Sequence, residues 1–168
     1  MNLRQIEGLT FNYPSVAMVA GTTSTITTTV TSGGVIGGKF VTAVTALTNS
    51  ASPTLDVVTG LAFPALVANQ NVALVIGWNA AGTLKMAQGP IAPTAPGVTT
   101  TAGAFLPNGP VFPAVFAVDD FVPAAYTVVR TSPTGNAFTA GTTAWAASGI
   151  TTLAFVNVCT LPDRPQTT

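Results

Sequence analysis

Residues 72–86 read VALVIGWNAAGTLKM and form the clearest structural pattern of the chain. Alternate residues in the first half, from Val72 to Trp78, are large and apolar, which is typical of a β-strand that turns one face towards a core. A short loop at residues 79–82 ends in glycine, and the apolar pattern then returns. Two alternating runs joined by a short loop with glycine predict a β-hairpin, so this stretch favours a β-sheet fold.

Further short runs of threonine, valine, phenylalanine and isoleucine lie on both sides of the hairpin, separated by glycine and proline. β-Branched and aromatic residues favour the pleated, half-buried surface of a strand. We therefore expect strands at residues 25–31, 40–48, 126–130 and 150–158, the last of them buried on both faces. Residues 111–118 are strongly apolar but contain Pro113, which places them at a sheet edge or a bulge. We also expect a stiff connector without strand or helix pattern at residues 90–96 and one helical turn at residues 144–147.

These patterns predict an all-β protein, either a β-sandwich or a jelly-roll-like barrel, with extended N- and C-terminal arms and at most one short helical turn. The length of 168 residues suits one domain with a sizeable core. We expect an N-terminal arm at residues 1–20, a single β domain at residues 21–160 and a C-terminal tail at residues 161–168.

The composition leaves few groups for chemistry. The chain has no histidine, one cysteine, 29 threonines and only ten charged side chains, five basic and five acidic. Acid–base catalysis and metal binding rely on histidine, cysteine and carboxylates, so we expect no enzyme, no metal site and no cofactor. A formal net charge of zero argues against nucleic acid and membrane partners. It also removes the repulsion that keeps free proteins apart, so we expect the chain to work inside an assembly.

Neither a secretion signal nor a membrane-spanning helix is expected. The apolar run at residues 16–20 is shorter than the core of a signal peptide, which takes about 7 to 15 residues. Six prolines interrupt the long uncharged stretch at residues 86–118, whereas a spanning helix needs about 20 continuous apolar residues. Cys159 is the single cysteine, and we expect it to be a small buried side chain.

Two local motifs could carry chemistry. Residues 33–39 fit the phosphate-loop pattern G-x-x-x-x-G-K, but Phe40 stands where a serine or threonine would bind Mg²⁺, so we expect a glycine turn between strands. Asp119 and Asp120 are adjacent carboxylates, but a calcium site needs at least about six oxygens, so we expect an exposed turn there. Most aromatic residues are expected in the core.

Three segments carry a resemblance to a known class of proteins. Residues 75–89 read VIGWNAAGTLKMAQG, residues 137–150 read AFTAGTTAWAASGI, and the chain closes on LPDRP at residues 161–165. These segments resemble small virion surface proteins of tailed bacteriophages, which decorate or cement the capsid or form head fibres. The resemblance implies a β-rich homotrimer without catalytic residues that binds the major capsid protein where capsomers meet. It also implies a place on the capsid surface of the virion, after synthesis in the host cytoplasm.

The two termini are the expected contacts with the major capsid protein and with neighbouring copies of the chain. From the resemblance to virion surface proteins, we expect apolar contacts from Leu3, Ile6, Phe11 and Tyr13 and hydrogen-bonding contacts from Arg4 and Arg164. Two alternatives stay open. One is a structural protein of the tail or of a fibre attachment, and the other is a module that binds a host glycan through exposed Trp78 or Trp145.

Overall fold

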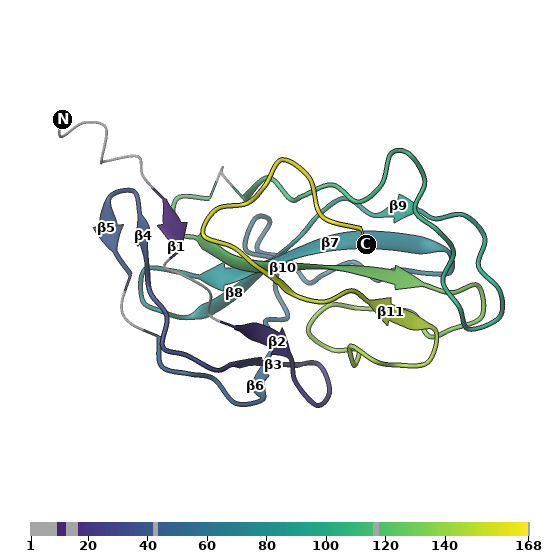
Figure 1. Cartoon of the computed structure of the whole chain (residues 1–168), viewed down its shortest axis with the longest axis horizontal. Coiled ribbons are helices and arrows are strands. Elements are labelled where there is room, and N and C mark those ends of the chain that lie inside the picture. The colour runs from purple at the N-terminus through teal and green to yellow at the C-terminus, as the bar shows by residue number, and fades with distance from the viewer. Residues whose placement is uncertain (1–9, 13–16, 42–43, 116–117, 168) are drawn as a thin grey trace.

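The computed structural model in Figure 1 describes residues 10–12, 17–41, 44–115 and 118–167. The regular elements of this part of the chain are β-strands, joined by turns and loops. They are β1 (Phe11–Asn12), β2 (Met18–Ala20), β3 (Thr25–Thr28), β4 (Gly34–Ile36), β5 (Lys39–Phe40), β6 (Ser50–Ala51), β7 (Gln70–Trp78), β8 (Leu84–Gln88), β9 (Ala92–Pro93), β10 (Val122–Thr131), β11 (Ile150–Thr152) and β12 (Val156–Asn157). The prediction of an all-β fold is confirmed.

A six-stranded antiparallel sheet forms the centre of the molecule. Its order is β11-β10-β7-β8, with β12 paired to β10 and β9 paired to β7. The register of β7 and β10, the two longest strands, runs from Val122 opposite Trp78 to Arg130 opposite Asn71. β8 returns from β7 with Leu84 opposite Trp78, so the predicted hairpin is confirmed.

Gly77 lies inside β7 because the backbone of β10 comes unusually close to it. A Cβ atom at this position would lie 2.0 Å from the carbonyl oxygen of Val122. The pairing of the two strands shifts register between Pro123 and Ala125, which marks a β-bulge at the same place. A glycine therefore lets the two longest strands approach each other at the bulge.

Two small antiparallel sheets lie beside the central one, with the orders β1-β4-β5 and β2-β3-β6. β3 covers the first four residues of the strand expected at residues 25–31, and its buried side chains are those of Ile26 and Thr28. Val30 lies beyond the end of β3 and is exposed. The strand alternation in this segment is therefore real, but it ends earlier than the sequence suggests.

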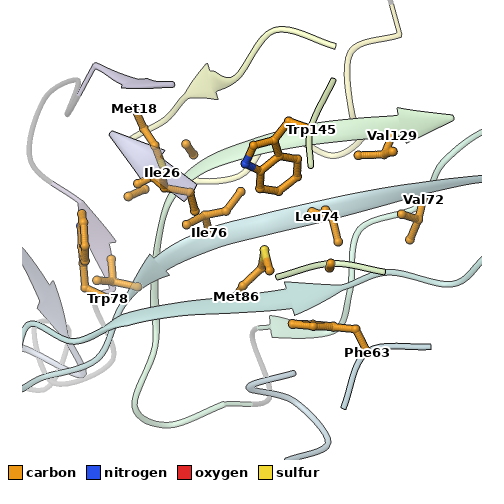
Figure 2. Close-up of a cluster of buried hydrophobic side chains, with 14 of the residues drawn as sticks. Met18, Ile26, Phe63, Val72, Leu74, Ile76, Trp78, Met86, Val129 and Trp145 are labelled. Atoms are coloured by element: carbon orange, nitrogen blue, oxygen red, sulfur yellow. The ribbon is translucent and has the colours of Figure 1, made fainter. Parts of the chain in front are cut away.

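Apolar side chains cover one face of the central sheet in a large cluster. Leu74 and Ile76 of β7 belong to it, together with Met18 and Ile26 from the β2-β3-β6 sheet. Figure 2 shows Trp145 packed over the same face, beside β7. This face is therefore covered by a second layer of strands and loops, as in a β-sandwich.

The opposite face of the central sheet carries a smaller cluster. Val75 lies opposite Ala87 on β8 and opposite Tyr126 on β10, so these three side chains share one row of this face. Val115 and Phe121 cover the row. The central strands are thus buried on both sides, and the sheets of the described residues form no closed barrel. The sandwich prediction fits, and the barrel alternative does not.

Several local predictions were wrong. The strand expected at residues 40–48 shrinks to the end of β5 and one bridge between Ser32 and Val44, and the connector expected at residues 90–96 contains β9. The described residues of the 111–118 segment form no strand. Pro113 cannot donate to a strand ladder, and Phe112 and Val115 pack on the smaller cluster instead.

The C-terminal third of the chain also differs from expectation. The strand predicted at residues 150–158 is interrupted between β11 and β12 and is half-buried. The helical turn expected at residues 144–147 is replaced by turns, in which the N–H of Ala147 donates to the carbonyl of Ala144 at 3.1 Å. Cys159 is exposed, not buried.

The described parts of the two termini lie against the domain. β1 pairs with β4, and β2 pairs with β3. In the tail, Leu161 packs on the smaller cluster, Pro165 is buried, and the N–H of Gln166 donates to the hydroxyl of Tyr126 at 3.1 Å. Within the described residues, no helix is long and apolar enough to span a membrane.

Candidate functional site

The residues predicted to contact a partner fall into two groups. Leu3, Arg4, Ile6 and Tyr13 lie outside the described residues. Phe11 is half-buried in β1, opposite Val35, and Arg164 is exposed in the tail. Phe11 thus belongs to the β1-β4-β5 sheet, whereas Arg164 belongs to the C-terminal tail.

Arg164 lines a shallow hollow of about 540 Å³ between the tail and the loop at residues 105–111. Asp163 lies beside it in the same lining, so the hollow carries one charge of each sign. Proline and glycine residues of the loop supply much of the rest. The lining of the hollow includes one carboxylate, that of Asp163, and one side-chain hydroxyl, that of Thr167.

The phosphate-loop pattern at residues 33–39 forms a β-hairpin. β4 and β5 are joined by Gly37 and Gly38, whose φ angles are 54° and 81°. Both residues of a two-residue turn in this conformation need positive φ, which glycine adopts without strain. The expected glycine turn between strands is confirmed, and β5 follows it directly, in the place where a phosphate loop has a helix N-terminus.

Asp119 and Asp120 form an exposed turn, as predicted. The carboxylate of Asp120 accepts a hydrogen bond from the N–H of Ala80 at 2.7 Å, which ties this turn to the loop between β7 and β8. Among the residues that the structure describes, no three His, Cys, Asp or Glu side chains gather where they could hold a metal ion.

Both tryptophans are buried. Trp78 is 0% exposed and Trp145 is 3% exposed, so neither offers the open ring face that the glycan alternative requires. The indole N–H of Trp145 donates to the carbonyl of Thr25 at 2.8 Å, and its ring meets Phe155 edge to face at 5.5 Å. Trp145 thus joins the β3 strand to the segment between β11 and β12.

The charged side chain of Arg130 packs against the loop at residues 103–105. Its guanidinium stacks over the ring of Phe105 at 4.7 Å and donates to the carbonyl of Gly103 at 3.0 Å. Desolvation by partial burial lowers the pKa of the Arg130 guanidinium from its ordinary value. These contacts hold the loop at residues 103–105 against β10.

Several large apolar side chains are exposed on one turn at residues 55–61, which we call the knob. Leu61 is 68% exposed, Leu55 is 56% exposed and Val58 is 36% exposed. The charged side chain within the knob is Asp56, and it is buried. Large apolar side chains that stand in water on one turn are typical of an interaction surface.

Hydrogen bonds inside the knob fix its shape. One carboxylate oxygen of Asp56 accepts the N–H of Val58 at 3.1 Å, and the other accepts the hydroxyl of Thr59 at 3.0 Å. The backbone N–H of Asp56 donates to the carbonyl of Leu61 at 2.8 Å, which closes the turn. Gly60, with φ of 72°, supplies the left-handed residue that the turn needs. The knob is therefore held in one conformation before any partner binds.

The knob lies along the outer edge of β8. Asp56 forms a parallel bridge with Met86, and the N–H of Val57 donates to the carbonyl of Met86 at 2.9 Å. Further along the same strand, the side-chain amide of Gln88 donates to the carbonyl of Pro64 at 3.1 Å. The knob thus covers a strand edge that would otherwise be open.

A second apolar surface is a shallow groove of about 420 Å³, which we call the apolar groove. It is lined by residues 19–20, 145–146 and 152–155. Trp145 is the buried member of the lining, while Val19 and Ala154 are exposed. The lining contains no charged residue.

Neither apolar surface was predicted from the sequence. The sequence does contain a pattern that indicates the knob, because residues 55–67 are mostly apolar but are interrupted by Gly60 and Pro64. Apolar residues in a turn have less core to enter than those in a strand, so some of them stay exposed. No sequence pattern indicates the apolar groove, since it forms where β2 lies against the residues between β11 and β12, which are distant from β2 in the sequence.

Comparison with protein-family models, with curated proteins and with solved structures finds no match to this chain.

Proposed function

We propose that this chain is a structural protein of a tailed-phage virion that binds the assembled capsid surface as a decoration or cement protein. Three features support the proposal. The segments at residues 75–89 and 137–150 resemble such proteins, the net charge is zero, and the fold is all-β. The knob adds a preformed apolar surface of the kind that protein assemblies bury.

The observation that carries the assembly role is the exposure of Leu61 and Leu55 on a rigid turn. Burying a large aliphatic side chain contributes about 1.5 to 3 kcal/mol relative to leaving it in water. A turn that is already ordered gives up little conformational entropy when it binds. The knob is therefore suited to a protein contact and not to catalysis.

A decoration protein stabilises a shell by mass action. It binds assembled capsomers but not the separated subunits, so its binding free energy adds to the stability of the assembled state. A specific contact needs about 800 Å² on each partner. The predicted contacts with the capsid stay those of the two termini, namely Leu3, Arg4, Ile6, Phe11, Tyr13 and Arg164.

Electron microscopy of virions tests the proposal. Density for this chain at fixed positions on the capsid lattice, present in virions that contain it and missing from virions that lack it, is the expected result. Density on the tail or at a fibre attachment would instead favour the tail alternative. Virions with identical density whether or not the chain is supplied would overturn both.

A further inference from the structure

We infer that the hollow between the C-terminal tail and the loop at residues 105–111 is a binding site for a neutral saccharide unit. The inference goes beyond the proposed function, because it concerns a ligand that the isolated chain binds without a capsid. It also uses neither tryptophan, so it differs from the glycan alternative, which requires an exposed ring of Trp78 or Trp145.

Both walls of the hollow rest on one buried residue of the central sheet, Tyr126. On the loop side, Phe112 directly follows the loop and packs edge to face on the Tyr126 ring at 4.9 Å. On the tail side, the N–H of Gln166 donates to the Tyr126 hydroxyl at 3.1 Å. Tyr126 is 1% exposed and belongs to β10, the longest strand, so it fixes the tail and the loop relative to each other. The hollow is therefore a preformed part of the folded domain.

The apolar part of the hollow is made of rings. Pro110 of the loop and Pro165 of the tail are both buried and line the hollow. Phe105 lines it as well, and its position is fixed by a backbone bridge to Thr94 and by the guanidinium of Arg130, which stacks on its ring at 4.7 Å. These rings offer an ordered apolar surface on which the C–H groups of a sugar ring can lie.

The polar side chains of the lining are exposed and available to a ligand. They are Asn108, Asp163, Arg164 and Thr167. Within the described part of the chain, none of these four side chains forms a hydrogen bond or an ion pair. A carboxylate accepts hydrogen bonds, a guanidinium donates them, and an amide or a hydroxyl group does both. The lining can therefore serve neighbouring hydroxyl groups of a sugar, each of which both donates and accepts.

The charges of the hollow disfavour an ionic ligand. Asp163 and Arg164 carry opposite charges and are adjacent in the chain, so a ligand of either sign would meet one like charge. A purely apolar ligand would bury the polar side chains of the lining without partners, which costs free energy. A neutral ligand with several hydroxyl groups avoids both costs.

An extended peptide fits the hollow poorly. Such peptides commonly pair their backbone with a free strand edge. Of the strands that the structure describes, none contributes a residue to the lining, and Pro107, Pro110 and Pro165 have no N–H to donate. The N–H of Gly109 already donates to the carbonyl of Leu106 at 2.8 Å. Recognition in the hollow therefore depends on side-chain groups, which suit the hydroxyl groups of a saccharide.

NMR titration of the isotope-labelled protein tests the inference. The probes are the methyl glycosides of glucose, galactose, mannose and N-acetylglucosamine, each raised to about 50 mM, far above the dissociation constant of about 1 mM that a weak site implies. Cyclohexanol, a ring with a single hydroxyl group, and inorganic phosphate are the control probes. At least one glycoside should move the amide signals of Asn108, Gly109 and Thr167 in a saturable way and leave that of Val98 in place. Neither control probe should move them.

Two variants test the polar side chains of the lining. Asp163→Ala should weaken glycoside binding about tenfold and Asn108→Ala about fivefold, because each removes hydrogen bonds to the ligand. The matched control is Asp119→Ala, which removes an exposed carboxylate from a turn outside the hollow. Arg164 is left unchanged, because it is also a predicted capsid contact. The NMR spectrum of each variant shows whether it keeps the fold.

Three results would overturn the inference. They are glycosides that move no amide signal of the hollow at the highest concentration, shifts that phosphate or cyclohexanol reproduces at the same concentrations, and Asp163→Ala and Asn108→Ala variants that bind the glycosides as tightly as Asp119→Ala. No capsid is present in these experiments, so their failure is distinct from a failure to bind capsids.

Discussion

The side chain of Asn157 takes the place of a neighbouring strand along β2 by bonding both backbone groups of Met18. The Oδ1 of Asn157 accepts the Met18 N–H at 2.7 Å, and its Nδ2 donates to the Met18 carbonyl at 3.3 Å. Asn157 belongs to β12, which pairs with β10. One amide side chain thus ties the β2-β3-β6 sheet to the central sheet.

Replacing this amide should destabilise the domain. Asn157→Ala leaves the N–H and carbonyl of Met18 without their partner, and an unsatisfied buried polar group costs about 1 to 3 kcal/mol. The free energy of unfolding from urea titration measures the effect. Asn157→Asp keeps the acceptor and should lose less, and Asn108→Ala at an exposed loop position should change little. Equal stability of Asn157→Ala and Asn108→Ala would show that the bonds contribute nothing.

Gly77→Ala should destabilise the central sheet. The added Cβ would lie 2.0 Å from the Val122 carbonyl oxygen, so β7 and β10 must separate at the bulge. Overpacking of this kind costs about 1 to 3 kcal/mol or more. Thermal unfolding measures the loss, with Gly109→Ala as the matched control, since a Cβ there has its nearest neighbour at 3.6 Å. A melting temperature for Gly77→Ala as high as that of the control would contradict the close approach.

Asp56→Ala should loosen the knob and lower the free energy of unfolding. The substitution removes the two hydrogen bonds that the carboxylate accepts from Val58 and Thr59. Each such bond contributes about 0.5 to 1.5 kcal/mol. Urea titration should show a larger loss of stability than for Asp119→Ala, which removes an exposed carboxylate in another turn. Equal stability of the two variants would mean that the carboxylate of Asp56 does not hold the knob.

How far the sequence predicts this fold depends on where its residues find partners. The hairpin at residues 72–86 is predictable because alternation and a glycine-containing loop are both local. Burial of β7 on both faces is not predictable from Val72 and Trp78 alone, because it requires Val115 and Phe121 to fold back over the second face. Periodicity reports one face of a strand, and the other face depends on distant segments.

Two of the mistaken predictions share one physical cause. The apolar run at residues 150–158 resembles one strand, but the strand is interrupted between β11 and β12, and residues of this break line the apolar groove. Residues 111–118 resemble an edge strand, but Phe112 stacks edge to face on Tyr126 at 4.9 Å and serves as a cover for the sheet. In both segments, tertiary packing outweighs the local preference for strand.

The sequence predicts that the chain has a contact surface, but not where this surface lies. A neutral, apolar composition indicates an assembly component, and this inference uses the whole chain. The position of the contact surface depends on the exposure of Leu55 and Leu61. The sequence does not indicate this exposure, because leucine is usually buried. The predicted contacts in residues 1–9 lie outside the described part of the chain, so they stay predictions.

Removing residues 1–9 should weaken binding to capsids and leave the domain folded. This deletion spares β1, which begins at Phe11 and pairs with β4, so the β1-β4-β5 sheet keeps its strands. Arg164→Ala should weaken binding in the same direction, because the side chain is exposed in the tail. Pelleting with capsids measures both, and circular dichroism checks the fold. Full binding by the deletion variant would refute the role of this segment.

Co-sedimentation with phage heads that lack this chain tests the central claim most directly. The purified protein is mixed with intact heads and with dissociated capsid subunits, and the bound fraction is measured as its concentration rises. A saturable fraction that pellets with heads at a fixed ratio to the capsid subunits, and no binding to dissociated subunits, is the predicted result. Protein that stays in the supernatant at every concentration would contradict the account of a capsid decoration protein.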